Sequence, residues 1–103
     1  MAEQIKVASA KSIEKTHCLR VEAMGQNIAL FKIGGDYFAI GDTCTHRGGP
    51  LSEGKLVGTI VTCPWHGAKF DVTSGAVMGA PARTNVPSFK VIVEGEDIKI
   101  EVP

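Results

Sequence analysis

The residues best suited to metal chemistry in this sequence form two cysteine–histidine pairs. The first pair is Cys44-Thr45-His46 and the second is Cys63-Pro64-Trp65-His66, with 16 residues between them. Each pair offers one thiolate and one imidazole on a short segment, and both groups are common metal ligands. Glycine and proline residues next to both pairs allow tight turns. The spacing therefore predicts two loops that hold one metal ion or one metal cluster.

Composition excludes several classes of protein. The chain has 103 residues, of which 44% are hydrophobic, and this suits one small core. Eleven lysines and arginines balance eleven aspartates and glutamates, so we expect no nucleic-acid partner. No apolar run is longer than the four residues Ile28–Phe31, and residues 1–4 do not resemble a signal peptide. We therefore expect a soluble, cytoplasmic protein with no membrane partner.

The elements that must position the two pairs are short strands. Twelve glycines and five prolines interrupt the chain, and no segment carries a helical stripe of apolar residues. We expect strands at 4–8, 16–24, 27–33, 37–41, 58–62, 68–72, 88–94 and 97–102. Within 16–24, Leu19, Val21 and Ala23 should face one side and Cys18 the other. Short strands in this number predict an all-β sandwich or barrel.

Residues 43–87 differ from the remainder of the chain. They contain seven of the twelve glycines and four of the five prolines, together with both cysteine–histidine pairs. This composition indicates a loop-rich insertion in a β-sheet base rather than an independent domain. We therefore expect a single domain that spans residues 1–103.

The two pairs and their neighbours resemble the cluster-binding loops of Rieske proteins. The resemblance covers residues 44–51 and 63–71, and it extends from Thr73 to Pro81, which is similar to the proline-bearing loop that shields the cluster in that family. Length and strand pattern fit the whole chain. The resemblance implies a Rieske-type antiparallel β-sandwich with a loop-rich cluster-binding subdomain at about 43–87.

The resemblance also implies one [2Fe–2S] cluster per chain. Cys44 and Cys63 would bind one iron, and His46 and His66 would bind the other. In this family the histidines lie near the surface, so redox partners would dock near His46 and His66. A structural zinc site is the alternative, but zinc sites usually use C-x₂₋₄-C or H-x₃₋₅-H pairs, and C-x-H is unusual among them.

Departures from the family pattern indicate a low reduction potential. High-potential Rieske proteins carry an extra cysteine in each loop, joined as a disulfide, whereas Gly49 and Trp65 occupy those positions here. Those proteins also have a serine and a tyrosine whose hydroxyls donate to sulfur, and here Ala68 and Phe70 replace them. With fewer hydrogen-bond donors to sulfur, the reduced cluster is less stabilised. We therefore expect a reduction potential of roughly −150 mV rather than +300 mV.

Among Rieske proteins, the pattern resembles the soluble ferredoxins of multicomponent ring-hydroxylating dioxygenases. Such a ferredoxin is an electron carrier and not an enzyme, and it passes electrons from a flavin-dependent reductase to a terminal oxygenase. Once the cluster takes two histidines, only His17 remains, and no 2-His-1-carboxylate iron site can form. The small Rieske subunit of an NAD(P)H-dependent nitrite reductase is the alternative, because it is similar in size and fold.

Five residues outside the ligand set are not expected to bind the metal. Alternation places Cys18 on the polar face of its strand, where we expect a thiol without a role. His17 falls on the apolar face, and we expect a hydrogen-bonded core histidine there. Trp65 and Phe70, with Leu51, should cover the cluster and limit the access of water.

Overall fold

The computed structural model describes residues 3–14, 17–23, 25–43, 50–65, 67–79 and 84–102. These residues form short strands with almost no helix, so the all-β prediction is confirmed. In these ranges, no helix has the length and apolar character needed to span a membrane. In chain order the elements are β1 (Glu3–Ser9), α1 (Ala10–Ile13), β2 (Cys18–Ala23), β3 (Gln26–Ile33), β4 (Asp36–Gly41), the 3₁₀ turn η1 (Leu51–Glu53), β5 (Lys55–Val57), β6 (Ile60–Thr62), β7 (Lys69–Asp71), β8 (Val77–Gly79), β9 (Ser88–Glu94) and β10 (Asp97–Val102).

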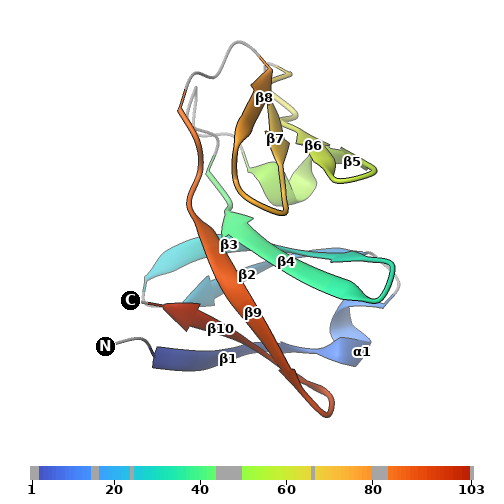
Figure 1. The fold of residues 1–103 in the computed structure, drawn as a ribbon, viewed down its shortest axis with the longest axis vertical. Helices are drawn as coiled ribbons and strands as arrows, with labels where there is room; N and C mark the ends of the chain where they lie inside the picture. The colour runs from blue at the N-terminus through green and yellow to red at the C-terminus, as the bar shows by residue number, and fades with distance from the viewer. Residues whose placement is uncertain are drawn as a thin grey trace.

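The larger of two sheets forms an antiparallel sandwich. Its six strands lie in the order β1-β10-β9-β4-β3-β2. At its middle, β4 and β9 share two residue pairs, Ala39 with Phe89 and Ile40 with Ser88. This narrow junction lets the two three-stranded halves face each other as layers (Figure 1). The predicted antiparallel β-sandwich is therefore confirmed.

The core between these layers follows from the period of two along each strand. On β2, Val21 and Ala23 are buried in this core and Leu19 packs against it, as predicted from alternation. The helical turn α1 adds Ile13, which is fully buried. The buried members of this core are Ile13, Val21, Ala23, Ile28, Leu30, Ala39, Ile98 and Ile100.

A second core lies on the opposite face of β3. Ile28 and Leu30 face the sandwich interior, whereas Ala29 and Phe31 face the smaller sheet. The smaller sheet has four antiparallel strands in the order β5-β6-β7-β8 and packs against one end of the sandwich (Figure 1). Strand β3 is thus buried on both faces, and this explains why the longest apolar run in the sequence occurs there.

Three sequence predictions of strands need correction. The strand expected at 58–62 begins later, as β6 at Ile60, because Gly58, with a φ of 61°, lies in the turn before it. That turn joins β6 to β5, a strand that was not expected. Neither β8 nor α1 was expected, because three or four residues are too few to show a period. The expected strand 16–24 is shorter than predicted, since β2 begins at Cys18.

The remaining strands lie within one residue of their predicted bounds or match them. Glycine occupies the turns that join these strands: Gly34 and Gly95 adopt φ values of 62° and 63° between β3 and β4 and between β9 and β10. Positive φ is costly for residues with a Cβ atom. Glycine–polar turns therefore signalled these hairpins reliably.

Gly75 should be far less tolerant of a side chain than Gly25. Both have positive φ, 79° and 76°, but a Cβ on Gly75 would overlap the carbonyl oxygen of Val86, whereas nothing lies near a Cβ on Gly25. We expect Gly25→Ala to cost about 1–2 kcal/mol of unfolding free energy and Gly75→Ala about 3 kcal/mol or more. Urea unfolding of both variants measures the difference, and equal losses would contradict this packing account.

Candidate metal centre

Cys63 is the predicted metal ligand that the structure describes. Cys44, His46 and His66 lie outside the described residues. Cys63 follows directly after β6 and its side chain is 2% exposed. In the part of the chain that is described, no three His, Cys, Asp or Glu side chains gather as a metal site. The described part of the site therefore consists of Cys63 and the segments that flank the other predicted ligands.

The backbone of Cys63 is fixed by a tight turn between β6 and β7. Its N–H donates a hydrogen bond of 2.7 Å to the carbonyl oxygen of Ala68, and its own carbonyl accepts one of 3.1 Å from the N–H of Gly67. Gly67 has a φ of 76°, in the left-handed region that favours glycine. The tight turn expected from Gly67 is confirmed, and it holds the Cys63 peptide from both sides.

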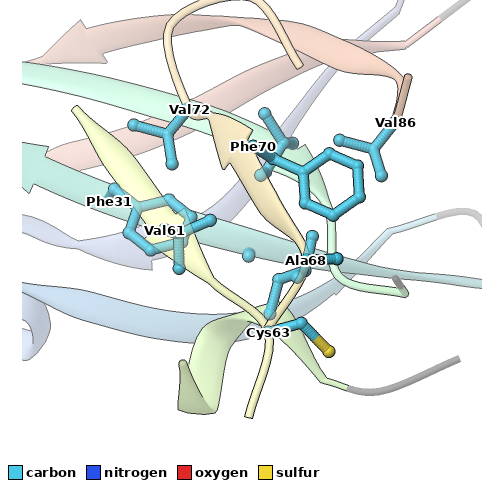
Figure 2. Close-up of a cluster of buried hydrophobic side chains, with 10 residues drawn as sticks. Phe31, Val61, Cys63, Ala68, Phe70, Val72 and Val86 are labelled. Atoms are coloured by element: carbon cyan, nitrogen blue, oxygen red, sulfur yellow. The ribbon is translucent and has the colours of Figure 1, made fainter. Parts of the chain in front are cut away.

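The side chain of Cys63 lies at the edge of the second core. Figure 2 shows its sulfur pointing away from Phe70 and Val86, out of the packed apolar group that also contains Val61 and Ala68. A thiolate in this position is shielded from water on its core side, while the sulfur remains directed outward. This arrangement suits a metal-bound thiolate with a dry environment on one side.

The segments on either side of residues 44–49 are held together. Thr43 and Pro50 form an isolated antiparallel bridge. One residue further out on each side, the N–H of Leu51 donates a 2.7 Å hydrogen bond to the carbonyl oxygen of Asp42. Both ends of the first predicted loop are therefore fixed at a narrow base.

A close backbone contact brings the two predicted loops next to each other. Gly54, just after η1, lies so near the carbonyl oxygen of Thr62 that a Cβ atom would overlap it. The adjacent residue Lys55 pairs with Thr62, which directly precedes Cys63. Leu51, at the end of the first loop, belongs to the same core as Cys63. The chain thus leaves the first loop beside the point where it enters the second.

Of the three residues expected to give apolar cover, two are buried and one is exposed. Leu51 and Phe70 are fully buried in the second core. Trp65, however, is 56% exposed, because it lies in the turn after Cys63 with its side chain outside the packed group. Ala68 is also fully buried, so positions 68 and 70 place methyl and phenyl groups, and no hydroxyl, in the core beside Cys63.

The expectations for Cys18 and His17 were wrong. His17 is exposed, since it lies before the first residue of β2 and adopts a φ of 59°. Cys18 is half-buried between the two sheets, and its Sγ donates a 2.9 Å hydrogen bond to the carbonyl oxygen of Ser52 in η1. No local sequence pattern predicts this bond, because its partners are 34 residues apart. The thiol therefore has a structural role.

Comparison with known proteins agrees with these features. A family model for the Rieske [2Fe–2S] domain matches residues 3–90. The ferredoxin component of biphenyl 2,3-dioxygenase from Rhodococcus jostii (strain RHA1) is 35% identical over 97 residues, which cover 94% of this chain and 91% of the relative. The ferredoxin component of the naphthalene 1,2-dioxygenase system from Pseudomonas aeruginosa is 31% identical over 98 residues, 95% and 94% of the two chains.

A solved structure is similar over the same range. It is a chain of the complex of reduced oxygenase and oxidized ferredoxin in carbazole 1,9a-dioxygenase, with 32% identity and a TM-score of 0.86. The match covers 94% of the chain described here and 91% of the other. The likeness therefore extends over both sheets and is not confined to the two loops.

Cys18 should make the stability of the fold sensitive to alkaline pH. Burial, helped by the negative charge of Asp42, raises the pKa of the Cys18 thiol from 9.0 to about 11. The unfolded chain then loses this proton before the folded one, so unfolding becomes easier as pH rises from about 9 to about 11. Urea unfolding from pH 8 to 11 should show a steeper loss in the wild type than in Cys18→Ala. Identical slopes would contradict this assignment.

Proposed function

This chain belongs to the Rieske [2Fe–2S] domain family, and from that membership we propose that it carries single electrons from a reductase to a terminal oxygenase. The relatives named above are ferredoxin components of dioxygenase systems, and the chain matches them over nearly its full length. Like these relatives, it is an electron-transfer protein rather than a catalytic enzyme, and its cofactor is one [2Fe–2S] cluster. No observation on the molecule favours the nitrite reductase alternative.

We assign the cluster ligands as Cys44 and Cys63 on one iron and His46 and His66 on the other. The observation that carries this assignment is the geometry around Cys63: a buried thiol, on a backbone fixed from both sides, with its sulfur directed out of the core. The first loop is closed at its base and ends beside the start of the second loop. Two thiolates and two imidazoles are the donor set that a Rieske cluster requires, so the residues fit the cofactor.

When bound, the cluster would supply one-electron chemistry. The remaining contributions come from the chain itself. Leu51 and Phe70 keep water away from the core side of Cys63. The hydrogen bonds of the Cys63 backbone hold that ligand in place, so that little rearrangement is needed when the charge on the site changes.

We further propose a potential at the low end of the Rieske range. Support comes from Ala68 and Phe70, which are both fully buried beside Cys63 and offer no hydroxyl donor to sulfur. Without such donors the added negative charge of the reduced cluster receives less stabilisation. A low potential suits a carrier that donates electrons onward to an oxygenase.

The partners in this proposal are a flavin-dependent reductase and a terminal oxygenase, which dock in turn near His46 and His66. Support for the oxygenase comes from the similar ferredoxin that was solved in complex with its oxygenase.

We place the carrier in the cytoplasm, where thiol ligands remain reduced. We also propose one domain over residues 1–103, with a cluster-binding part at about 43–87. The four-stranded sheet between Lys55 and Gly79 supports this division.

Replacing Cys63 should remove the cluster. We expect wild-type protein to give a reversible one-electron wave in protein-film voltammetry, and Cys63→Ala to give none, since no other described cysteine is near that position in the sequence. Cys18→Ala is the matched control and should keep both the wave and the visible spectrum. A Cys63→Ala variant with the full visible spectrum would refute the ligand assignment. The absence of a wave from wild-type protein with its native metal content would refute the electron-carrier function.

Adding hydroxyls at positions 68 and 70 should raise the potential. Ala68→Ser and Phe70→Tyr each place an O–H group in the core beside Cys63. A new hydrogen bond worth about 1 kcal/mol in favour of the reduced state corresponds to roughly 40 mV. Phe89→Tyr, which adds the same group against the sandwich core, should leave the potential unchanged. If Ala68→Ser and Phe70→Tyr behave like this control, missing donors do not set the potential.

A further inference from the structure

Asp42 is an unusual residue for its position. It follows directly after β4, and its exposed fraction is 3%. Among the residues that the structure describes, it is the one polar or charged side chain that is buried. Burying a carboxylate is costly unless it is well hydrogen-bonded. The contacts of Asp42 should therefore indicate the role of this residue.

Three atoms of Asp42 hold separate segments together. Its N–H donates to the carbonyl oxygen of Asn27 at 3.0 Å, which ties it to β3. Its carbonyl oxygen accepts from the N–H of Leu51 at 2.7 Å, and its carboxylate Oδ1 accepts from the N–H of Ser52, also at 2.7 Å. Leu51 and Ser52 are the first residues of η1, so Asp42 binds the returning end of the first loop with its backbone and its side chain together.

The partner of the carboxylate is itself held from the other side. The carbonyl oxygen of Ser52 accepts the hydrogen bond from the Cys18 thiol on β2. Ser52 is therefore fixed between β2 and the end of β4, through its carbonyl and its N–H respectively. With the Thr43–Pro50 bridge, these bonds join the two described segments that flank the first predicted loop in the sequence.

Among the residues that the structure describes, no ion pair involves Asp42. Its described partner is a neutral amide, and the ion pairs in the described ranges join Lys6, Lys11 and Lys99 to carboxylates of other residues. Asp42 also precedes Cys44 by two residues, so their Cα atoms lie within about 7.6 Å of each other. A buried charge interacts more strongly with neighbouring charges than a charge in water does.

We propose that Asp42 is a positioning residue that closes the base of the first cluster-binding loop, and that its buried negative charge lowers the reduction potential of the cluster. This inference rests on the assignment of Cys44 as a ligand in the proposed function. An electron added to the cluster is repelled by the carboxylate, so the oxidised form is favoured. The same residue thus fixes the geometry of the loop and tunes its electrostatics.

Asp42→Asn separates the charge from the geometry. The amide keeps an oxygen acceptor for the Ser52 N–H and nearly the same shape, so we expect wild-type iron content and visible spectrum. The midpoint potential should shift to a more positive value. Asp36→Asn is the matched control, since it removes the same charge from the exposed opposite end of β4. The shift at Asp42 should exceed that at Asp36 and should persist at high salt, because buried charges are poorly screened. Equal shifts, or none, would overturn the electrostatic part.

Asp42→Ala tests the positioning role. It removes the acceptor, so the Ser52 N–H loses its partner and the base of the loop loosens. We expect Asp42→Ala to release iron to a chelator several-fold faster than wild type, as measured by bleaching of the visible bands. Asp42→Asn should release iron at the wild-type rate. Equal rates for all three would overturn the positioning part. Because these experiments use protein that holds its cluster, their failure is distinct from failure of the ligand assignment, which loss of the visible spectrum in Cys44→Ala and Cys63→Ala tests.

Discussion

The side chains of Ile28–Phe31 alternate between two hydrophobic cores, and both sheets depend on this alternation. The smaller sheet has four strands of three residues each, and a sheet of that size would not be stable alone. It is stable here because Ala29 and Phe31, with Ile40 of β4, present an apolar face on which it packs. The candidate metal centre is thus positioned by strands that supply none of its predicted ligands.

The contacts around the two loops are made largely by the backbone. Cys63, Thr43 and Pro50 are fixed through peptide groups, and Gly54 permits a main-chain approach that any side chain would block. Side chains enter at few points, chiefly through the carboxylate of Asp42 and the thiol of Cys18. A site fixed in this way keeps its shape while its charge changes, as a protein that gains and loses electrons requires.

The longer strands could be predicted from the sequence because alternation and glycine turns act over a few neighbouring residues. Residues 88–94 and 97–102 were placed with their observed bounds for this reason. The three-residue strands β5 and β8 could not be predicted, since they form by pairing with neighbouring strands and are too short to show an alternation of apolar and polar residues. The family could be predicted because metal binding demands particular residue types at particular spacings.

What the sequence could not reveal depends on long-range contacts. The bond from Cys18 to Ser52 joins residues that are far apart in the chain, and the exposure of Trp65 depends on the direction of the turn after Cys63. His17 was misplaced for a local reason, because a positive φ at a histidine ends the alternation one residue before the strand begins. Such conformations leave little trace in composition.

The pairing of the first and last strands affects how this protein could be fused to another protein or attached to a surface. Glu3 lies opposite Val102, so the chain begins and ends at neighbouring points, on the part of the sandwich remote from the smaller sheet (Figure 1). A linker at either end would therefore extend away from the smaller sheet. Fusion to another protein, or immobilisation on an electrode through a terminal tag, would leave the smaller sheet facing outward and accessible.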